Sequence, residues 1–360
     1  MQLRICRDEE MIFEDVLTIK NGKNQKAVEN PNGKYPIYGS GGVMGYADDY
    51  ICNANTVIVG RKGSINNPIF VEEPFWNVDT AFGLEAKQDI LLPKYLYYFC
   101  KHFDFERLNK AVTIPSLTKG DLLKIEIDLP ITEEQQTIVD KLSGIEEIID
   151  LRKLELQKLD ELIKARFVEL FGNPVLNDKG WVQKSLGEIT TKIGSGATPK
   201  GGKEAYQEDG ITLIRSMNVH NGQFEYKDLA HISDEQAAKL DNVTIEVNDV
   251  LLNITGASVA RSCVVPVKVL PARVNQHVCI IRCKDCIIPE FLNKLLIDDN
   301  YQDLLWGIAG SGATREAITK QQVEGLQIIM PPIELQREFM VFCKQVDKSK
   351  VMKPRNLLVS

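Results

Sequence analysis

The feature that most constrains this chain is an internal repeat, visible without gaps at a shift of 201 residues. Residues 117–145 form the clearest part of the first copy, and residues 318–346 form the same part of the second. The matched pairs are Leu117/Ile318, Thr118/Thr319, Lys119/Lys320, Ile125/Leu326, Ile127/Ile328, Leu129/Met330, Pro130/Pro331, Glu133/Glu334, Gln135/Gln336, Ile138/Phe339, Leu142/Cys343 and Ile145/Val346. A repeat of this length predicts two tandem copies of one structural unit.

Looser matches extend the repeat upstream. The further pairs are Asn55 with Asn248, Gly63 with Gly256, Asn77 with Asn275, and Pro93 with Pro289. Lys124–Leu129 alternates weakly with a period of two, which indicates a strand. Thr132 can cap the helix that follows, with Gln135 at the capping-box position. Each unit is therefore predicted to be a strand-rich globule followed by a helix.

A long helix is predicted between the two units. From Ile138 to Leu170 apolar residues recur at spacings of four and three, interrupted by Arg152 and Arg166, a pattern typical of a coiled coil. Over residues 133–171, at about 1.5 Å per residue, this helix is on the order of 58 Å long, more than the ~34 Å of one turn of B-DNA. The pattern allows a ruler between two globules, but the heptad alone favours a plain dimerisation coiled coil.

The second helix does not mirror the first. It begins at Glu334 and keeps its apolar seam through Val346. Lys350 then takes the position of Ile149, and residues 351–360 contain a proline and no heptad. A shortened second helix is the expectation.

Composition limits the class of protein. The formal net charge is -7, with -3 in residues 1–130, -4 in residues 131–173 and zero in the remainder. Any DNA contact must therefore come from local basic loops. Eight scattered cysteines favour free thiols in a reducing cytoplasm. No stretch approaches the ~20 apolar residues of a membrane span, and residues 1–10 lack the apolar core of a signal peptide. We therefore expect a cytoplasmic protein.

Two weak motifs would suit a self-contained enzyme. Cys279, Cys283 and Cys286 have the spacing of a radical iron–sulfur site, but the surrounding alternation indicates a strand instead of a flexible loop. Asn67-Pro-Ile-Phe70 resembles an adenine-methyltransferase motif but lacks its second proline, and no cofactor loop accompanies it. Both fit a structural role better, so no catalytic residue is predicted.

Loops rich in Gly, Ser, Thr, Lys and Arg remain. They are Tyr38-Gly-Ser-Gly-Gly42, Gly60-Arg-Lys-Gly-Ser64, Gly194-Ser-Gly-Ala-Thr-Pro-Lys200 and Gly310-Ser-Gly-Ala-Thr-Arg315. Glycine lets backbone N–H groups approach phosphates, and Arg or Lys supplies charge or reads guanine edges. An ordinary turn is the alternative for each of these loops.

In this order, the motifs resemble the specificity subunits of type I restriction-modification systems, over nearly the whole chain. The second unit carries Ile193-Gly-Ser-Gly-Ala-Thr-Pro-Lys200, Ile214-Arg-Ser-Met-Asn-Val219, Asp249-Val-Leu-Leu-Asn-Ile-Thr-Gly-Ala-Ser258, Val274-Asn-Gln-His277 and Pro331-Pro-Ile-Glu-Leu-Gln336. The first unit is similar to another subtype, through Tyr35-Pro-Ile-Tyr-Gly-Ser-Gly-Gly42, Val59-Gly-Arg-Lys-Gly-Ser64 and Phe75-Trp-Asn-Val-Asp-Thr80.

The resemblance implies an α+β fold. Two tandem, strand-rich target-recognition domains would each be followed by a long helix, and the helices would pair as an antiparallel coiled coil. The expected boundaries are 1–130 for the first domain, 131–173 for the central helix, 174–331 for the second domain and 332–360 for the shortened helix. Pairing is expected from Ile138, Leu142, Ile145, Ile149, Leu156, Leu159, Ile163, Phe339, Cys343 and Val346.

The resemblance also implies a non-catalytic function. Each domain would read one half of a bipartite DNA site, and the helices would set the half-site spacing. The expected partners are double-stranded DNA, methyltransferase subunits and motor-nuclease subunits, with no membrane. No metal or cofactor is expected on this chain; S-adenosylmethionine, ATP and magnesium would be bound by the partner subunits. The alternatives to this DNA-recognition function are a self-contained enzyme, either a radical iron–sulfur protein or a DNA methyltransferase, and a coiled-coil scaffold without DNA binding.

The predicted DNA contacts come from the loops of both units. In the first unit they are Lys23, Lys26, Tyr38, Ser40, Arg61 and Lys62. In the second they are Ser195, Lys200, Lys203, Arg215, Asn218, Asn275 and Arg315. Asn275 sits between apolar strand residues and is the candidate best suited to a buried hydrogen-bonding role instead.

Overall fold

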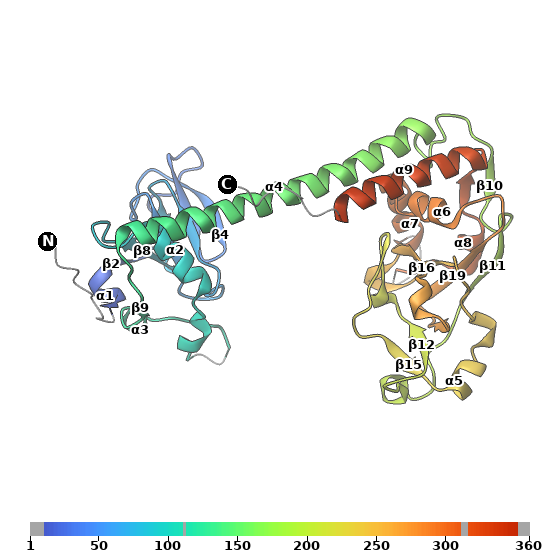
Figure 1. The fold of residues 1–360 in the computed structure, drawn as a ribbon, viewed down its shortest axis with the longest axis horizontal. Helices are drawn as coiled ribbons and strands as arrows, with labels where there is room; N and C mark the ends of the chain where they lie inside the picture. The colour runs from blue at the N-terminus through green and yellow to red at the C-terminus, as the bar shows by residue number, and fades with distance from the viewer. Residues whose placement is uncertain (1–10, 111–112, 311–315, 352–360) are drawn as a thin grey trace. The chain divides into compact units, whose positions relative to one another are not determined.

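The chain divides into two compact units, Met1–Lys153 and Leu154–Ser360. The computed structural model describes residues 11–110, 113–310 and 316–351, without the side chains of Lys203 and Ala205. The division falls within the long helix α4 (Thr132–Phe171), so one part of this helix belongs to each unit. Figure 1 traces both units along the chain.

The first unit consists of short strands and short helices that lead into α4. Its elements are β1 (Met11–Ile12), α1 (Phe13–Val16), β2 (Leu17–Asn21), β3 (Tyr35–Gly39), β4 (Gly42–Ala47), β5 (Thr56–Gly60), β6 (Ile69–Val71), β7 (Trp76–Asn77), β8 (Ala81–Ala86), α2 (Pro93–His102), η1 (Phe105–Leu108), α3 (Lys119–Leu122) and β9 (Glu126–Ile127). The helix α2 begins at the proline that the repeat singled out, since proline suits the first helical turn.

The second unit follows α4 and ends with the last described helix. Its elements are β10 (Gln183–Ser185), β11 (Thr190–Ser195), η2 (Gly202–Ala205), β12 (Ile211–Ile214), η3 (Ser216–Asn218), β13 (Val219–His220), β14 (Gln223–Phe224), β15 (Ala230–Ile232), α5 (Asp234–Ala238), η4 (Asp241–Val243), β16 (Val250–Asn253), η5 (Gly256–Ser258), β17 (Ser262–Val264), η6 (Val267–Val269), β18 (Ala272–Val274), β19 (Val278–Cys283), α6 (Pro289–Leu296), α7 (Asp299–Gly310), α8 (Lys320–Glu324), β20 (Gln327–Ile329) and α9 (Ile333–Val351).

The sheets of the two units have the same strand order. A four-stranded sheet runs β2-β8-β5-β6 in the first unit and β11-β19-β16-β17 in the second. A three-stranded sheet runs β4-β3-β7 and β15-β12-β18, and its last pair is parallel in both. A two-stranded sheet joins the beginning and the end of each unit, as β1-β9 and β10-β20. The sequence repeat is therefore a repeat of topology.

Alternation along the strands divides each four-stranded sheet into two faces. In β19, Cys279 and Ile281 belong to the core that contains the helices, whereas Val278 and Ile280 belong to the core shared with β12 and β18. This two-residue period is that of a strand covered on both faces. In the second unit, α6 lies between the helix α9 and the sheet strand β16 (Figure 1).

One buried glutamine fixes α4 to the first unit. The Oε1 atom of Gln135 accepts a hydrogen bond from the backbone N–H of Leu92 (2.9 Å). Its Nε2 atom donates to the carbonyls of Ile90 (2.8 Å) and Pro130 (2.9 Å). The predicted capping box is therefore wrong: the helix begins at Thr132, and Gln135 reaches into the domain because unpaired backbone groups there require a partner.

Gln336 repeats this arrangement at the start of α9. Its Oε1 accepts from the backbone N–H of Ile288 (3.0 Å), and its Nε2 donates to the carbonyls of Cys286 (3.4 Å) and Pro331 (2.9 Å). Gln135 and Gln336 are both fully buried. The two residues are 201 positions apart, so the repeat preserves the clamp between domain and helix.

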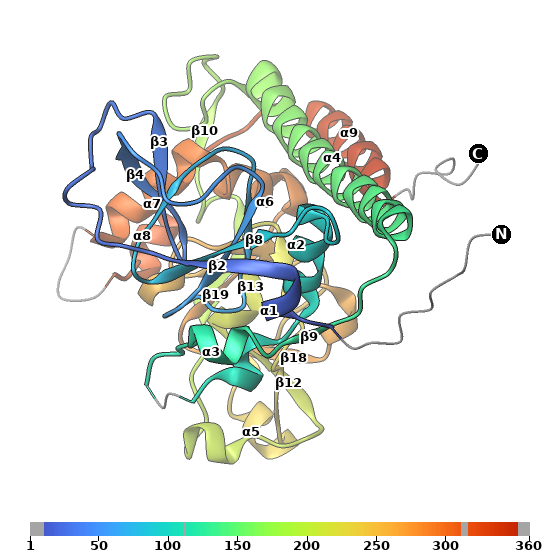
Figure 2. The same ribbon diagram turned by 90° about the vertical axis from the view of Figure 1, so that its left-hand side faces the viewer.

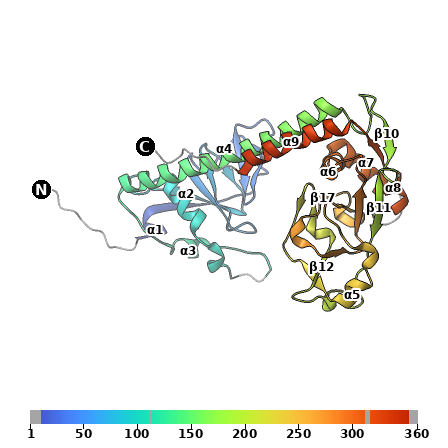
Figure 3. The same ribbon diagram turned by 45° about the vertical axis from the view of Figure 1, so that its right-hand side comes forward.

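In the second unit, the C-terminal part of α4 pairs with α9. The pairing is antiparallel, because Arg166 contacts Glu338 (3.2 Å) and Asp160 contacts Lys350 (2.7 Å). The buried side chains of the pair are Ile163, Phe167, Phe171, Phe339, Met340, Cys343 and Val346. Figures 2 and 3 show α9 alongside this part of α4.

The residues predicted for helix pairing divide into three groups. Ile163, Phe339, Cys343 and Val346 are buried in the helix pair. Ile138, Leu142, Leu156 and Leu159 are half-buried. Ile145 and Ile149, which belong to the first unit, are 52% and 48% exposed, so this part of the predicted seam is not buried.

The part of α4 in the first unit packs through a different face. Val139 is buried, and Tyr98 of α2 hydrogen-bonds to Ser143 (2.9 Å) and Glu146 (2.8 Å). The apolar heptad could not predict this face because much of its contact is polar.

The helix α9 is described as far as Val351, where Lys350 bonds to Asp160 and Asp347. Residues 352–360, which were predicted to lack the heptad pattern, lie outside the described residues. Among the residues that the structure describes, no helix is long and apolar enough to cross a membrane.

Candidate nucleic-acid interface

In the first unit, loops that follow several strands meet at one end of the sheets. The backbone N–H of Lys23 donates to the carbonyl of Asn77 (2.9 Å), and that of Arg61 donates to the carbonyl of Thr80 (2.8 Å). A Cβ atom added to Gly60 would lie 3.1 Å from the Cβ of Ser40. The first loop cluster comprises residues 22–26, 40–42, 61–64, 78–80 and 113–116.

Most of the contacts predicted for the first unit lie on the first loop cluster. They are Lys23, Lys26, Ser40, Arg61 and Lys62; the four basic residues are exposed. The guanidinium of Arg61 lies 5.7 Å from the ring centroid of Phe82. Tyr38 lies within β3, where its ring packs edge-on against Phe75 and burial raises the pKa of its hydroxyl. Tyr38 therefore mainly supports the sheet.

In the second unit, the equivalent loops also meet. The backbone N–H of Gly196 donates to the carbonyl of Asn275 (3.1 Å), and Asn275 donates to Ile214 (3.1 Å). Ile254 donates to the carbonyl of His277 (3.0 Å). The second loop cluster comprises residues 195–200, 215–218, 254–258, 275–277 and 316–319.

The predicted residues of the second unit have unequal access to a ligand. Ser195 and Lys200 are exposed. Arg215 is half-buried, with its guanidinium 5.4 Å from the ring centroid of Tyr206. The side chain of Lys203 and the whole of Arg315 lie outside the described residues.

The two predicted asparagines are buried. The Nδ2 atom of Asn218 donates to the carbonyls of Glu225 (3.1 Å) and Lys227 (3.2 Å), and its Oδ1 accepts from the N–H of Arg215 (3.1 Å). The Oδ1 atom of Asn275 accepts from the N–H of the residue two positions on, at 3.0 Å. Both side chains hold their own loops, so the prediction that they contact DNA is replaced by a structural role.

A glycine turn is shared by the two clusters. Gly63 has φ +82° and donates to the carbonyl of Pro115 (3.0 Å); Gly256 has φ +73° and donates to that of Glu316 (2.9 Å). Residues other than glycine are strained at such φ values. These glycines are therefore explained by the turn itself, whether or not a phosphate binds nearby.

Backbone hydrogen bonds set the equivalence between the clusters. At the start of β8, Ala81 donates to Val78 (3.0 Å), and at the start of β19, Val278 donates to Asn275 (3.4 Å). The sequence match of Asn77 with Asn275 is therefore displaced by one residue. The equivalent pairs are Val78 and Asn275, Asp79 and Gln276, and Thr80 and His277.

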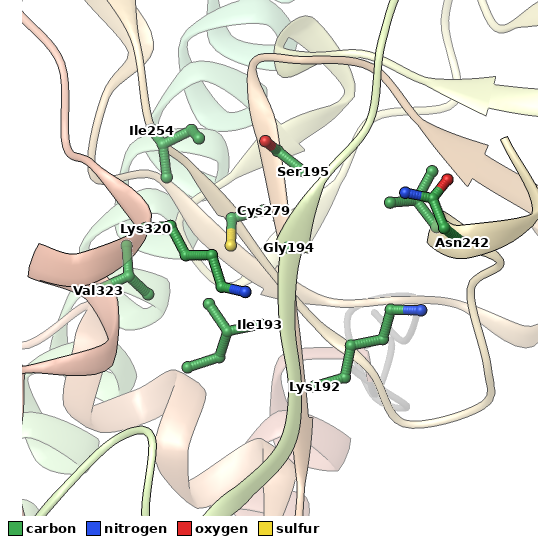
Figure 4. A pocket seen from close by; sticks show the side chains of 10 residues that line it. Lys192, Ile193, Gly194, Ser195, Asn242, Ile254, Cys279, Lys320 and Val323 are labelled. Atoms are coloured by element: carbon green, nitrogen blue, oxygen red, sulfur yellow. The ribbon is translucent and has the colours of Figure 1, made fainter.

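Lys192 and Lys320 were not predicted, yet both line a pocket of about 360 Å³ beside the second loop cluster. Figure 4 shows Lys320 and Cys279 on one side of the strand at Gly194, and Lys192 on the other. Two ammonium groups near exposed Ser195 suit a DNA phosphate. The only sequence signal for them was the match of Lys320 within the repeat.

The cysteine motif does not assemble as a cluster site. Cys279 is buried within β19, and burial raises its pKa to about 12. Burial likewise raises the pKa of Cys283 to about 12, whereas Cys286 is exposed. Metal ligation requires the thiolate, which this environment disfavours. Among the described side chains, no three His, Cys, Asp or Glu residues are grouped to hold a metal ion.

The sequence model of the type I restriction modification DNA specificity domain matches residues 9–161 and 178–357. The chain belongs to this family. The MjaVIII type I restriction enzyme specificity subunit of Methanocaldococcus jannaschii is 24% identical over 215 residues, which are 57% of this chain and 51% of that protein. The EcoBI specificity subunit of Escherichia coli is 23% identical over 316 residues, 78% of this chain and 64% of that protein. The chain thus spans 51% of the length of the first relative and 64% of the length of the second, less than two thirds of either.

Solved structures confirm the predicted α+β fold with two tandem units. The crystal structure of the type I restriction-modification S subunit from M. genitalium has a TM-score of 0.63 at 18% identity, over 97% of this chain and 92% of that one. A structure determined for complex assembly and conformational transition of the type I R-M system has a TM-score of 0.57 at 18% identity, over 95% and 90%. At 18% identity, the structural similarity establishes the fold of this chain.

Proposed function

We propose that this chain is the DNA-recognition subunit of a type I restriction-modification complex. Each unit reads one half of a bipartite site, and the chain itself supplies no catalytic residue. The observation that carries the proposal is the paired loop clusters, which lie at equivalent ends of equivalent sheets and present different exposed polar side chains. A scaffold that is repeated while its loop chemistry changes is suited to reading two different sequences.

We propose residues 1–130 and 174–331 as the recognition domains and residues 131–173 and 332–360 as the spacer segments, the second of which contains α9. We infer that these helices set the half-site spacing and dock methyltransferase subunits, with motor-nuclease subunits completing the complex. S-adenosylmethionine, ATP and magnesium belong to the partner subunits. Two features support a cytoplasmic location. The cysteines among the described residues are free thiols, and the proposed ligand, DNA, is found inside the cell.

The contacts proposed for phosphates or guanine edges are mainly exposed cations. They are Lys23, Lys26, Arg61, Lys62, Lys200 and Lys320, together with the half-buried Lys192. Ser40 and Ser195 are polar candidates beside them. Arg215 can contribute once its guanidinium leaves the ring of Tyr206 and the carbonyl of Asp228. Lys203 and Arg315 stay sequence-based candidates.

The experiment is selection from a random double-stranded DNA library by the chain assembled with its methyltransferase partner. We expect a motif in two parts separated by a fixed gap of unspecified bases. A library without enrichment would contradict DNA recognition. A single continuous motif would contradict reading by two units.

Spacer length can be tested in the same assay. Seven residues inserted after Leu151 would lengthen α4 by about 10 Å. This is the length of roughly three base pairs of DNA. The gap between the two parts of the motif should lengthen accordingly, and both parts should keep their sequence. A bipartite motif with an unchanged gap would support DNA recognition but contradict the proposal that α4 sets the half-site spacing.

A further inference from the structure

Gln276 is an exposed side chain that the second loop cluster holds in place. The hydroxyl of Thr198 donates to its Oε1 (2.5 Å), and its Nε2 donates to Nε2 of His277 (3.0 Å). The other ring nitrogen of His277, Nδ1, bonds to the hydroxyl of Thr255 (2.5 Å). Segments after β11, β16 and β18 thus join in one chain of hydrogen bonds that ends on a carboxamide.

The carboxamide keeps hydrogen-bonding capacity on its exposed side. A glutamine amide has two N–H donors and two lone pairs on its oxygen. Among the described residues, Thr198 uses one lone pair and His277 uses one N–H. One donor and one acceptor therefore remain. That pair matches the N7 acceptor and N6 amino group that adenine presents in the major groove.

The fold does not require an amide at this position. The equivalent residue of the first unit is Asp79, which is also exposed. Thr255 and His277 correspond to Lys62 and Thr80, which make no comparable chain among the described side chains. Fixing a glutamine side chain costs about as much conformational entropy as exposed hydrogen bonds contribute in stability. These hydrogen bonds therefore stabilise the fold little. They do pre-organise the amide for a ligand.

We propose that Gln276 is a specificity-determining residue that reads one adenine in the half-site of the second unit. Thr198 and His277 are positioning residues that hold the amide before DNA binds. The inference rests on the proposed function and adds to it one residue, one base and one half of the motif. A good bidentate contact of this kind favours its base by roughly 5- to 140-fold.

The test is library selection with the assembled complex, comparing the wild-type chain with Gln276→Ala. We expect the preference for adenine at one position of one half-site to fall by roughly 5- to 140-fold, with the other half-site unchanged. Gln276→Glu should move the preference at that position from adenine towards cytosine, because a carboxylate accepts from the cytosine amino group. Thr198→Val should weaken the preference less than Gln276→Ala does.

The control is Gln183→Ala, which removes an exposed glutamine from β10, outside the second loop cluster. It should leave the whole motif unchanged. Each variant is first checked for assembly with the methyltransferase subunit, and Gln276→Glu decides the question should Gln276→Ala not assemble.

The outcomes separate this inference from the proposed function. A bipartite wild-type motif that Gln276→Ala leaves unaltered would overturn the inference and leave the function standing. A uniform loss of affinity with the same preferred bases would also overturn it, since that result describes a phosphate contact. Absence of a bipartite motif for the wild-type complex would overturn the proposed function itself.

Discussion

The turn after β5 in the first unit carries Arg61 and Lys62, whereas the equivalent turn after β16 in the second carries Ile254 and Thr255. Both turns contain a glycine with positive φ that donates a hydrogen bond to the segment before α3 in the first unit and before α8 in the second. The first unit therefore presents charge where the second presents a hydroxyl bonded to His277. Equivalent backbones can thus carry different recognition chemistry, because a turn constrains φ and ψ more than it constrains its exposed side chains.

The helices provide a second contrast. The second unit buries a cluster of phenylalanines between two helices. The ring centroid of Phe339 lies 5.4 Å from that of Phe171 and 5.6 Å from that of Phe167. The first unit meets α4 through a buried glutamine, one buried valine and polar contacts to α2. We expect the helix to depend on hydrophobic burial in one unit and on hydrogen bonds in the other.

The largest effect is expected for Phe339→Ala. Removing a fully buried phenylalanine should lower the free energy of unfolding of the second unit by about 3–5 kcal/mol. Hydrogen exchange followed by mass spectrometry should show faster exchange in peptides of α9 and the end of α4, with peptides of the first unit unchanged. Val341→Ala, at a side chain that is 55% exposed, is the control. An equal increase of hydrogen exchange in both units would contradict the expectation that each unit is stabilised by its own core.

Gln135→Ala and Gln336→Ala test the feature that the units share. Each leaves a backbone N–H and carbonyls near the helix start without their partner, so each should cost about 1–3 kcal/mol in its own unit. Urea denaturation and hydrogen exchange would measure both. Gln136→Ala is the matched control because that side chain is exposed. Clearly unequal costs would show that the clamp has diverged between the copies.

Replacing both Arg61 and Lys62 by alanine sharpens the contrast between charged and uncharged turns. If each contacts a phosphate, the slope of log affinity against log salt should become shallower by about 1.8. Thr255→Val should leave that slope unchanged and relax sequence preference in the other half-site. Fluorescence anisotropy on the selected DNA at several salt concentrations would measure this, with Lys124→Ala as the control. An unchanged slope in the double variant would exclude phosphate contacts by this turn.

The smallest effect is expected for Glu146→Gln. Burial opposes ionisation of Glu146, but hydrogen bonds from Lys101 and Tyr98 outweigh it and hold its pKa below the usual value. A carboxyl whose pKa is lowered by folding stabilises the folded state at neutral pH, and this contribution is lost as the pH falls through the folded pKa. Both side chains of the ion pair with Lys101 are more than a third exposed, so the cost should stay below about 1 kcal/mol.

The measurement is urea denaturation at pH 7 and at pH 3. The wild type and Glu146→Gln should differ at pH 7 and converge at pH 3. Glu147→Gln, at an exposed neighbour on the same helix, should match the wild type at both. A difference that grows at low pH would contradict the assignment.

The sequence by itself determined the architecture. The 201-residue repeat, the proline at the start of α2 and of α6, and the strand alternation around Cys279 all reappear in the structure. These features are local, since they depend on spacing along one segment or on the fixed φ of proline. The loops that form the two clusters were predicted for the same reason, because glycine and polar residues mark turns.

Only the tertiary structure decided which loop side chains are available. Asn218 and Asn275 look like contacts in the sequence, yet both are buried, while Gln276, adjacent to one of them, is exposed and held by a threonine 78 positions away. The heptad likewise predicted the seam that pairs with α9 but not the face of α4 that bonds to Tyr98. Such contacts depend on which backbone groups from distant segments need a hydrogen-bond partner, and residue spacing within one segment carries no record of that.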